Sequence, residues 1–215
     1  MRGLFITIEG GEGVGKSTNL TFLETFLRNS GVDLVSTREP GGTALGEDIR
    51  AMLLRDWDKP MCPNAELLLI FAARAQHLNE VIEPALAAGK WVLCDRFTDA
   101  TYAYQCAGRG MDREKVKYLE SFIQGHLRPD YTVLLDVPVQ IGIKRARERG
   151  ELDRFEQEEV DFFERVREGY LIQAENNCDR YRLINANRSL AEVQQDLLRF
   201  GSELLATTES SQTES

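Results

Sequence analysis

Cysteine and histidine are scarce in this chain, which has four cysteines and two histidines among its 215 residues. The cysteines are Cys62, Cys94, Cys106 and Cys178. They form no C-x-x-C pair, so the sequence excludes the usual spacings of zinc sites and of redox motifs. Such isolated thiols are typical of reduced cysteines in a cytosolic protein. His77 and His126 have no metal-ligand spacing, and the sequence assigns neither a role.

Long apolar runs and a basic excess are also absent. No apolar run approaches the length of a membrane span, and the first residues lead directly into a short apolar segment, so we expect neither a membrane partner nor a signal peptide. The formal net charge of −9 argues against wholesale binding to nucleic acid. These absences predict a cytoplasmic protein, in which any anionic substrate meets a local cluster of arginines.

A glycine-rich loop stands between an apolar run and a segment with helical spacing of leucines. The pattern G-x-x-x-x-G-K-[ST] is met by Gly10, Gly15, Lys16 and Ser17. Glycines let backbone N–H groups approach a phosphate, the lysine reaches the β- and γ-phosphates, and the hydroxyl holds Mg²⁺. We therefore assign ATP binding to Gly10, Gly11, Glu12, Gly13, Val14, Gly15, Lys16, Ser17 and Thr18, here called the P-loop.

Short apolar segments alternate with amphipathic ones along the chain. The expected strands lie at 4–8, 32–37, 91–94, 131–135 and 181–184. The expected helices lie at 16–29, 65–88, 97–105, 112–124, 138–149, 158–175 and 190–205. One more helix is expected to begin after Thr43, which can serve as its N-cap. This alternation predicts an α/β fold, a three-layer sandwich with a five-stranded parallel sheet between helices. We expect one domain at 1–205 and a disordered polar tail at 206–215.

Polar side chains follow the predicted strands where those strands end. The P-loop follows the first strand, Arg38 and Glu39 the second, Asp95 and Arg96 the third, and Asp136 the fourth. Because the carboxyl ends of parallel strands meet at one edge of a sheet, these groups are expected to share one site.

Several short runs resemble one family, the thymidylate kinases. They are EGVGKS at 12–17, TREPGGT at 37–43, FAAR at 71–74, DRF at 95–97, YAYQ at 102–105, RG at 109–110 and RARERGELDR at 145–154. Each run is weak alone, but their order and spacing are specific, and the match covers residues 5 to about 205. The resemblance implies an ATP-dependent kinase that converts dTMP to dTDP with Mg²⁺, usually as a homodimer.

By this resemblance Lys16, Arg96 and Asp95 are catalytic. Arg96 is the expected clamp on the acceptor phosphate, and Asp95 orients it or, with Ser17, supports the metal. The middle of the P-loop has no basic residue, whereas Arg145, Arg147, Arg149 and Arg154 crowd the break near Gly150. The family implies a mobile lid at about 145–157 that supplies the catalytic arginine, either Arg149 or Arg154. The alternative is that these arginines only balance neighbouring acidic residues.

The resemblance also implies a dTMP site. Glu12 is expected at the sugar hydroxyl, Tyr104 under the deoxyribose and Phe71 stacked on thymine. Base-edge contacts fall to Arg74, with Thr101 or Gln105 as the second partner. Glu39 completes the predicted set. Without the resemblance, Phe71 is better explained as a core residue, since it lies in a leucine-rich helix stripe.

Two other functions stay open at this point. One is a related P-loop kinase for another nucleoside monophosphate or a small hydroxyl acceptor. The other is a non-catalytic nucleotide sensor. The arginine-rich lid argues against it, because a sensor does not need a second group of arginines to hold phosphates. A GTPase is excluded because no lysine has aspartate two residues later, as the guanine-reading motif requires.

Overall fold

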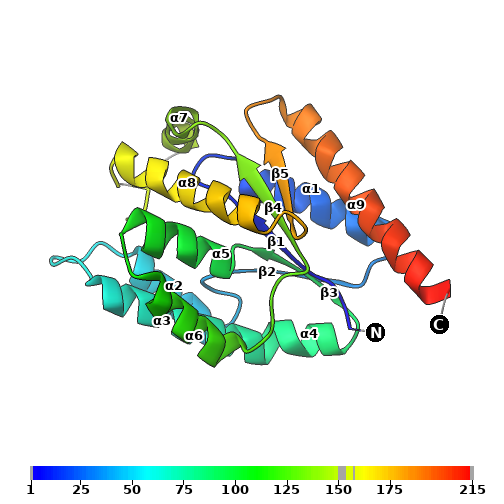
Figure 1. The fold of residues 1–215 in the computed structure, drawn as a ribbon, viewed down its shortest axis with the longest axis horizontal. Helices are drawn as coiled ribbons and strands as arrows, with labels where there is room; N and C mark the ends of the chain where they lie inside the picture. Colours follow the sequence, from blue (N-terminus) through cyan, green and yellow to red (C-terminus); the bar gives the residue numbers. More distant parts are fainter. Residues whose placement is uncertain (1, 150–153, 157, 214–215) are drawn as a thin grey trace.

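The structure, a computed structural model, describes residues 2–149, 154–156 and 158–213, except for the side chains of residue 149 and residues 209–213. Its sheet has five parallel strands in the order β2-β3-β1-β4-β5. The strands are β1 (Phe5–Glu9), β2 (Leu34–Arg38), β3 (Trp91–Asp95), β4 (Tyr131–Asp136) and β5 (Tyr181–Asn185). The predicted fold class is confirmed (Figure 1).

Each strand ends one residue later than expected. The last residues are polar, and three of them, Arg38, Asp95 and Asp136, are the groups expected at the rim of the sheet. They still belong to the ladder, however, because Arg38 lies opposite Asp95, and Asp136 lies opposite Asn185. The strands therefore deliver these side chains to the edge of the sheet on a hydrogen-bonded backbone.

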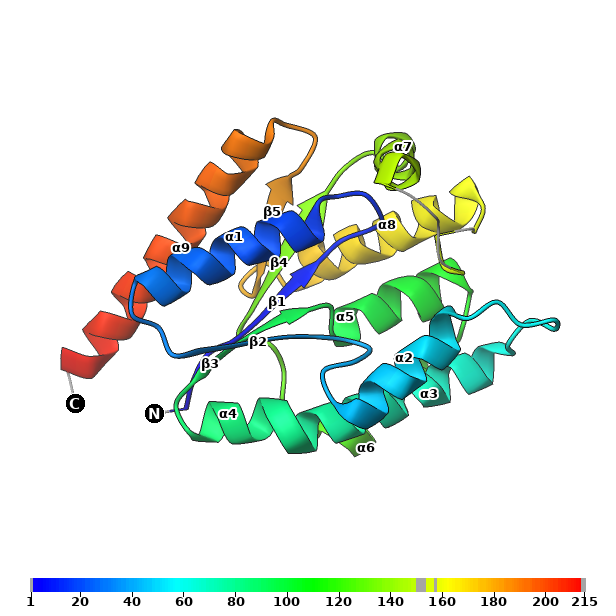
Figure 2. The same cartoon turned by 180° about the vertical axis from the view of Figure 1, so that it is seen from behind.

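Helices cover both faces of the sheet (Figures 1 and 2). On one face α1 and α9 pack on apolar residues of β1, including Ile6 and Ile8. On the other face Phe5 and Val92 meet the segment that runs from α3 to α4. The helices are α1 (Lys16–Asn29), α2 (Ala44–Leu54), α3 (Pro63–His77), η1 (Leu78–Ile82), α4 (Glu83–Ala87), α5 (Thr98–Thr101), η2 (Tyr102–Gly108), α6 (Arg113–Gln124), α7 (Val139–Arg149), α8 (Val160–Asn176) and α9 (Leu190–Thr213).

Local chemistry explains several helix boundaries. Thr43 caps α2 as predicted, because its hydroxyl accepts a hydrogen bond from the Gly46 N–H at 3.0 Å. The helix expected to begin at 65 instead begins at Pro63, whose fixed φ suits a first turn. The segment to residue 88 is interrupted by the wide turn η1, which precedes Pro84, a residue without an N–H donor.

The last helix is longer than predicted. We expected a helix at 190–205 and a disordered tail, but α9 continues to Thr213, so residues 206–213 are helical. The hydroxyls of Thr207 and Thr208 donate to carbonyl groups one turn earlier, which satisfies these polar side chains within the helix. In the part of the chain that is described, no helix has the length and apolar character needed to cross a membrane.

Candidate active site

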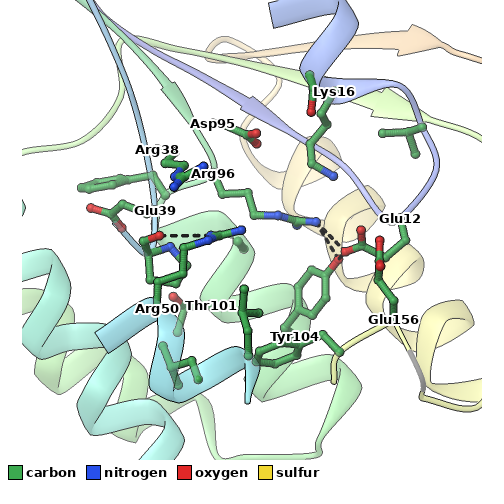
Figure 3. Close-up of a pocket in the computed structure, with 18 of the residues that line it drawn as sticks. Glu12, Lys16, Arg38, Glu39, Arg50, Asp95, Arg96, Thr101, Tyr104 and Glu156 are labelled. Atoms are coloured by element: carbon green, nitrogen blue, oxygen red, sulfur yellow. Dashed lines mark hydrogen bonds and ion pairs between the residues drawn. The ribbon is translucent and has the colours of Figure 1, made fainter. Parts of the chain in front are cut away.

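A cavity of about 520 Å³ opens at the carboxyl ends of β1, β2 and β3. This volume falls in the range of small-molecule sites. Predicted site residues that line it are Glu12, Gly13, Val14, Gly15, Lys16, Ser17, Thr18, Glu39, Arg74, Asp95, Arg96, Thr101, Tyr104 and Gln105. Side chains from the P-loop, the end of β3 and the helices beyond it converge there (Figure 3).

The P-loop has the backbone that its glycines predict. Gly10, Gly13 and Gly15 all have positive φ, at 143°, 66° and 87°. A Cβ on Gly13 would lie 1.9 Å from the carbonyl oxygen of Gly142, so only glycine fits there. Lys16 begins α1, and its Nζ donates to the carbonyl oxygens of Gly10 and Gly11 at 3.1 and 2.8 Å. Burial lowers the pKa of this ammonium group.

Arg96 stands beside the P-loop with an unusual backbone. Its φ is 67°, in the left-handed region, and its guanidinium faces Glu12 (Figure 3). Nη2 donates to Glu12 Oε1 at 2.7 Å and to the Tyr104 hydroxyl at 3.0 Å, and Nη1 donates to the Tyr170 hydroxyl at 3.1 Å. The Tyr104 hydroxyl in turn donates to Glu12 at 2.6 Å. One network therefore joins the catalytic and sugar-binding residues of the prediction.

A buried carboxyl group that the sequence reasoning missed supports this network. Glu9 accepts hydrogen bonds from the Phe97 N–H at 2.7 Å and from the Tyr170 hydroxyl at 2.8 Å. Its burial, with Asp99 nearby, raises its pKa to about 8. Glu9 holds the residue after Arg96, and Tyr170 holds the guanidinium itself. An acidic residue at the buried end of the first strand was a usable signal, whereas Tyr170 lies in an ordinary amphipathic helix.

At the opposite end of the cavity Arg74 is buried in a fixed position. Only 1% of its side chain is exposed, and Nε donates to Glu39 Oε2 at 2.7 Å. Nη2 donates to Thr101 Oγ1 at 3.1 Å, whereas Nη1 has no partner among the described residues. A buried donor without a partner costs free energy, so Nη1 is suited to a ligand acceptor.

His77 also has a place at this end. We assigned it no role, yet Nδ1 lies 3.0 Å from Glu39 Oε1 and Nε2 lies 2.6 Å from Thr37 Oγ1. His77 therefore holds the Glu39 carboxylate in position, and Glu39 in turn holds the Arg74 guanidinium. The spacing of Arg74 and His77, three residues apart on a helix, was the available signal.

The structure places Phe71 in the core. Its side chain is 2% exposed and packs with Leu67, Cys106 and Val116, under the guanidinium of Arg74 at 4.8 Å. The helix instead presents Ile70, four residues before Arg74, to the cavity. A ring that stacks on a base needs an open face, so the structure does not support stacking by Phe71 and favours the core interpretation.

The two lid arginines differ in what can be described. Arg154 donates from Nη2 to Glu66 Oε2 at 2.6 Å and from Nε to the Leu53 carbonyl at 2.8 Å, so its guanidinium is held by residues of α2 and α3. The Arg149 side chain and residues 150–153 lie outside the described part of the chain. Three further arginines line the cavity. Arg38 was expected there from its strand end and Arg145 belongs to the arginine-rich segment of the predicted lid, whereas the sequence did not single out Arg50.

The predicted metal residues, Ser17 and Asp95, both line the cavity. Asp95 Oδ1 is buried without a hydrogen-bond partner among the described residues, which fits an oxygen that serves a cation or its water. The described chain contains no cluster of three or more metal-binding side chains. Mg²⁺ needs only one or two ligands from the protein, because it keeps several waters and binds substrate phosphates.

Comparisons with known proteins show the family to which the chain belongs. The family model described as thymidylate kinase matches residues 8–197. A thymidylate kinase from Teredinibacter turnerae is 59% identical over 199 residues, covering 93% of this chain and 97% of that protein. One from Pseudomonas syringae pv. tomato is 58% identical over 205 residues, covering 95% and 98%. The crystal structure of thymidylate kinase from Ehrlichia chaffeensis has a TM-score of 0.73 at 31% identity, covering 93% of this chain and 99% of that one.

Proposed function

Because the chain belongs to the thymidylate kinase family, we propose that the cavity described above carries out phosphoryl transfer from ATP to dTMP with the residues named below. The protein is a transferase that phosphorylates dTMP to dTDP, in the synthesis of dTTP. Its relatives do not favour a kinase for another nucleoside monophosphate.

The observation that carries the proposal is the chemical contrast between the two ends of the cavity. One end has the P-loop, Lys16 and Arg96, which suit two phosphate groups. The other end has Arg74 Nη1, a donor that has no partner among the described residues and suits the carbonyl oxygen of a base. A nucleoside monophosphate placed between them brings its phosphate to the phosphates of ATP.

The reaction needs electrostatic help more than a base. A nucleotide phosphate is mostly a dianion at pH 7, so its oxygen attacks without proton removal. The difficulty is to bring two anions together in line. Lys16 and the P-loop N–H groups hold the phosphates of ATP, and Arg96 holds the acceptor phosphate. Mg²⁺, when bound, neutralises charge on the phosphates of ATP, with Ser17 and Asp95 as the residues that would hold it and its waters.

The remaining predicted residues position the acceptor. Arg74 and Gln105 bind the base edge, with Thr101 and Glu39 holding Arg74 in place. Tyr104 lies under the sugar and Glu12 binds its hydroxyl. For the lid arginine we propose Arg149, because it follows Arg145 by one helical turn in α7 and Arg145 lines the cavity.

We also propose a cytoplasmic homodimer. Large apolar side chains are exposed on the neighbouring helices α2, α3 and α6, among them Leu68 at 57%, Tyr118 at 71% and Phe122 at 73%. An apolar surface of this kind supports an interface with a second copy. Sedimentation of the protein tests it: a monomer at all concentrations would contradict the proposal.

A coupled assay of ADP formation with ATP, Mg²⁺ and a series of acceptors tests the proposed function. We expect turnover of dTMP well above that of dCMP, dGMP or AMP. Absence of turnover with dTMP would overturn the function, and binding of ATP without any ADP formation would support a nucleotide sensor. Omission of Mg²⁺ should abolish activity and its return should restore it.

A further inference from the structure

Glu66 is a buried carboxylate that accepts hydrogen bonds from three side chains, one of which, Gln105, lines the cavity. Its side chain is 1% exposed and lies on α3. Oε1 accepts from Gln105 Nε2 at 3.0 Å and from Arg109 Nε at 2.6 Å, while Oε2 accepts from Arg154 Nη2 at 2.6 Å. Burial opposes its charge, but hydrogen bonds from Arg109 and Gln105 outweigh this and lower its pKa. Glu66 is therefore ionised and can only accept hydrogen bonds.

This charge decides the orientation of the Gln105 amide. An amide has one end that donates and one that accepts, and a carboxylate can bind only the donor end. The NH₂ group of Gln105 must consequently face Glu66. Its carbonyl oxygen is then turned away, and no donor among the described residues contacts that oxygen. Gln105 lines the cavity. An amide oxygen that receives no hydrogen bond from the protein is suited to a ligand N–H.

Arg74 supplies the complementary group at the same end of the cavity. Thr101 accepts from Arg74 at 3.1 Å and precedes Gln105 by four residues in one continuous helical segment. The wall therefore presents a donor, Arg74 Nη1, and an acceptor, Gln105 Oε1. A 4-oxo pyrimidine has the matching edge, with a carbonyl acceptor at O4 next to the N3–H donor, whereas cytosine has an amino donor at C4 next to an N3 acceptor.

We propose that Glu66 is a positioning residue for base selection: it holds the Gln105 amide oxygen toward the base and thereby favours a 4-oxo over a 4-amino pyrimidine. The inference rests on the proposed function, in which Arg74 and Gln105 bind the base edge. Glu66 itself contacts no substrate. Its effect reaches the nucleotide through the single hydrogen bond to Gln105, so it should act on selectivity more than on the chemical step.

Glu66→Gln is the decisive variant, because a neutral amide can donate as well as accept and so permits both orientations of Gln105. The measurement is kcat/KM for dTMP and for dCMP. We expect the preference for dTMP over dCMP to fall about tenfold, the effect of losing one base-edge contact. If Glu66 only stabilises the fold, both substrates lose equally and the preference is unchanged, which would overturn the proposal.

Glu158→Gln is the matched control. Glu158 also binds Arg109, at 2.8 Å, but makes no hydrogen bond to Gln105. The same neutralisation at this position should leave the dTMP-to-dCMP preference unchanged. A loss of preference equal to that of Glu66→Gln would show that Arg109, and not the Gln105 amide, carries the effect, and would contradict the proposal.

Gln105→Ala keeps the proposal testable if Glu66→Gln does not fold. This variant should lose the preference by itself, and Glu66→Gln in its background should lower the preference no further. If Gln105→Ala retains full preference, base reading by Gln105 and the role of Glu66 both fail. If wild-type protein does not phosphorylate dTMP at all, the proposed function fails instead, so the two failures are distinguishable.

Discussion

The two ends of the cavity hold their charged groups in different ways. At the phosphate end, Arg96 and Glu12 remain 17% and 14% exposed and share their hydrogen bonds with two tyrosine hydroxyls. At the base end, Arg74, Glu39 and Glu66 are 1%, 4% and 1% exposed. Accessible charges can exchange their partners for phosphate oxygens during each turnover. Fully buried groups keep one hydrogen-bonding pattern, and a mismatched ligand then leaves a buried group unpaired, which gives selectivity.

This difference predicts that substitutions at the phosphate end lower kcat, whereas substitutions at the base end mainly change KM or substrate preference.

The largest effects are expected for Lys16→Ala and Arg96→Ala. Each should lower kcat at least about 100-fold, because each removes a charge that stabilises the transferring phosphoryl group. Arg28→Ala, an exposed arginine on α1, is the control and should retain normal kcat. Near-normal turnover without Arg96 would show that the phosphate end is misplaced.

The lid arginines sharpen the comparison, since Arg154 is bound to Glu66 at the base end. Arg149→Ala should lower kcat by about tenfold or more, as expected for a group that stabilises the transition state. Arg154→Ala should change kcat by less than about threefold and act chiefly on the KM for dTMP, because its guanidinium binds Glu66 and the Leu53 carbonyl group and not the phosphate end. Steady-state kinetics of the two variants would refute the assignment if Arg154→Ala had the larger effect on kcat.

Tyr104 lies between the two ends, and two variants separate its ring from its hydroxyl. Tyr104→Phe removes the hydrogen bonds of the hydroxyl to Glu12 and Arg96. We expect kcat to fall about tenfold, which corresponds to the loss of one charge-assisted hydrogen bond of about 1.5 kcal/mol. Tyr104→Ala should in addition relax discrimination against the ribonucleotide. The measurement is the ratio of kcat/KM for dTMP to kcat/KM for ribothymidine monophosphate. Unchanged discrimination in the alanine variant would refute the steric role of the ring.

The smallest expected effect concerns stability at the phosphate end. The pKa of Glu9, about 8 in the folded protein, exceeds its usual 4.5. Between these values the native state keeps a proton that the unfolded chain has lost, so the free energy of unfolding falls as pH rises from 4.5 to 8. The Tm of the wild type should fall relative to that of Glu9→Gln by about 3 °C or more between pH 5 and 9. A constant difference between the two Tm values would contradict a protonated Glu9.

The phosphate end was predictable because its residues belong to one local motif or follow strand ends. Gly10 to Thr18 are contiguous, and Arg96 follows Asp95 at the end of a buried strand. The base end was predicted only partly. Arg74 and Gln105 were found through the family resemblance, but Glu66 and His77 act through partners 38 to 88 residues away along the chain. No spacing marks Glu66, and the position of His77 one helical turn after Arg74 is a weak signal by itself. Phe71 illustrates the limit of sequence-based prediction, because it lies in the core whereas the preceding residue, Ile70, lines the cavity.

A structure of the protein with dTMP and a non-hydrolysable ATP analogue is the most direct test of the opposition between a phosphate end and a base end. We expect thymine O4 within hydrogen-bond distance of Arg74 Nη1, N3–H donating to Gln105 Oε1, and the dTMP phosphate bound by Arg96. The reverse orientation, with the base beside the P-loop, or a Gln105 amide that presents its NH₂ group to thymine, would contradict it.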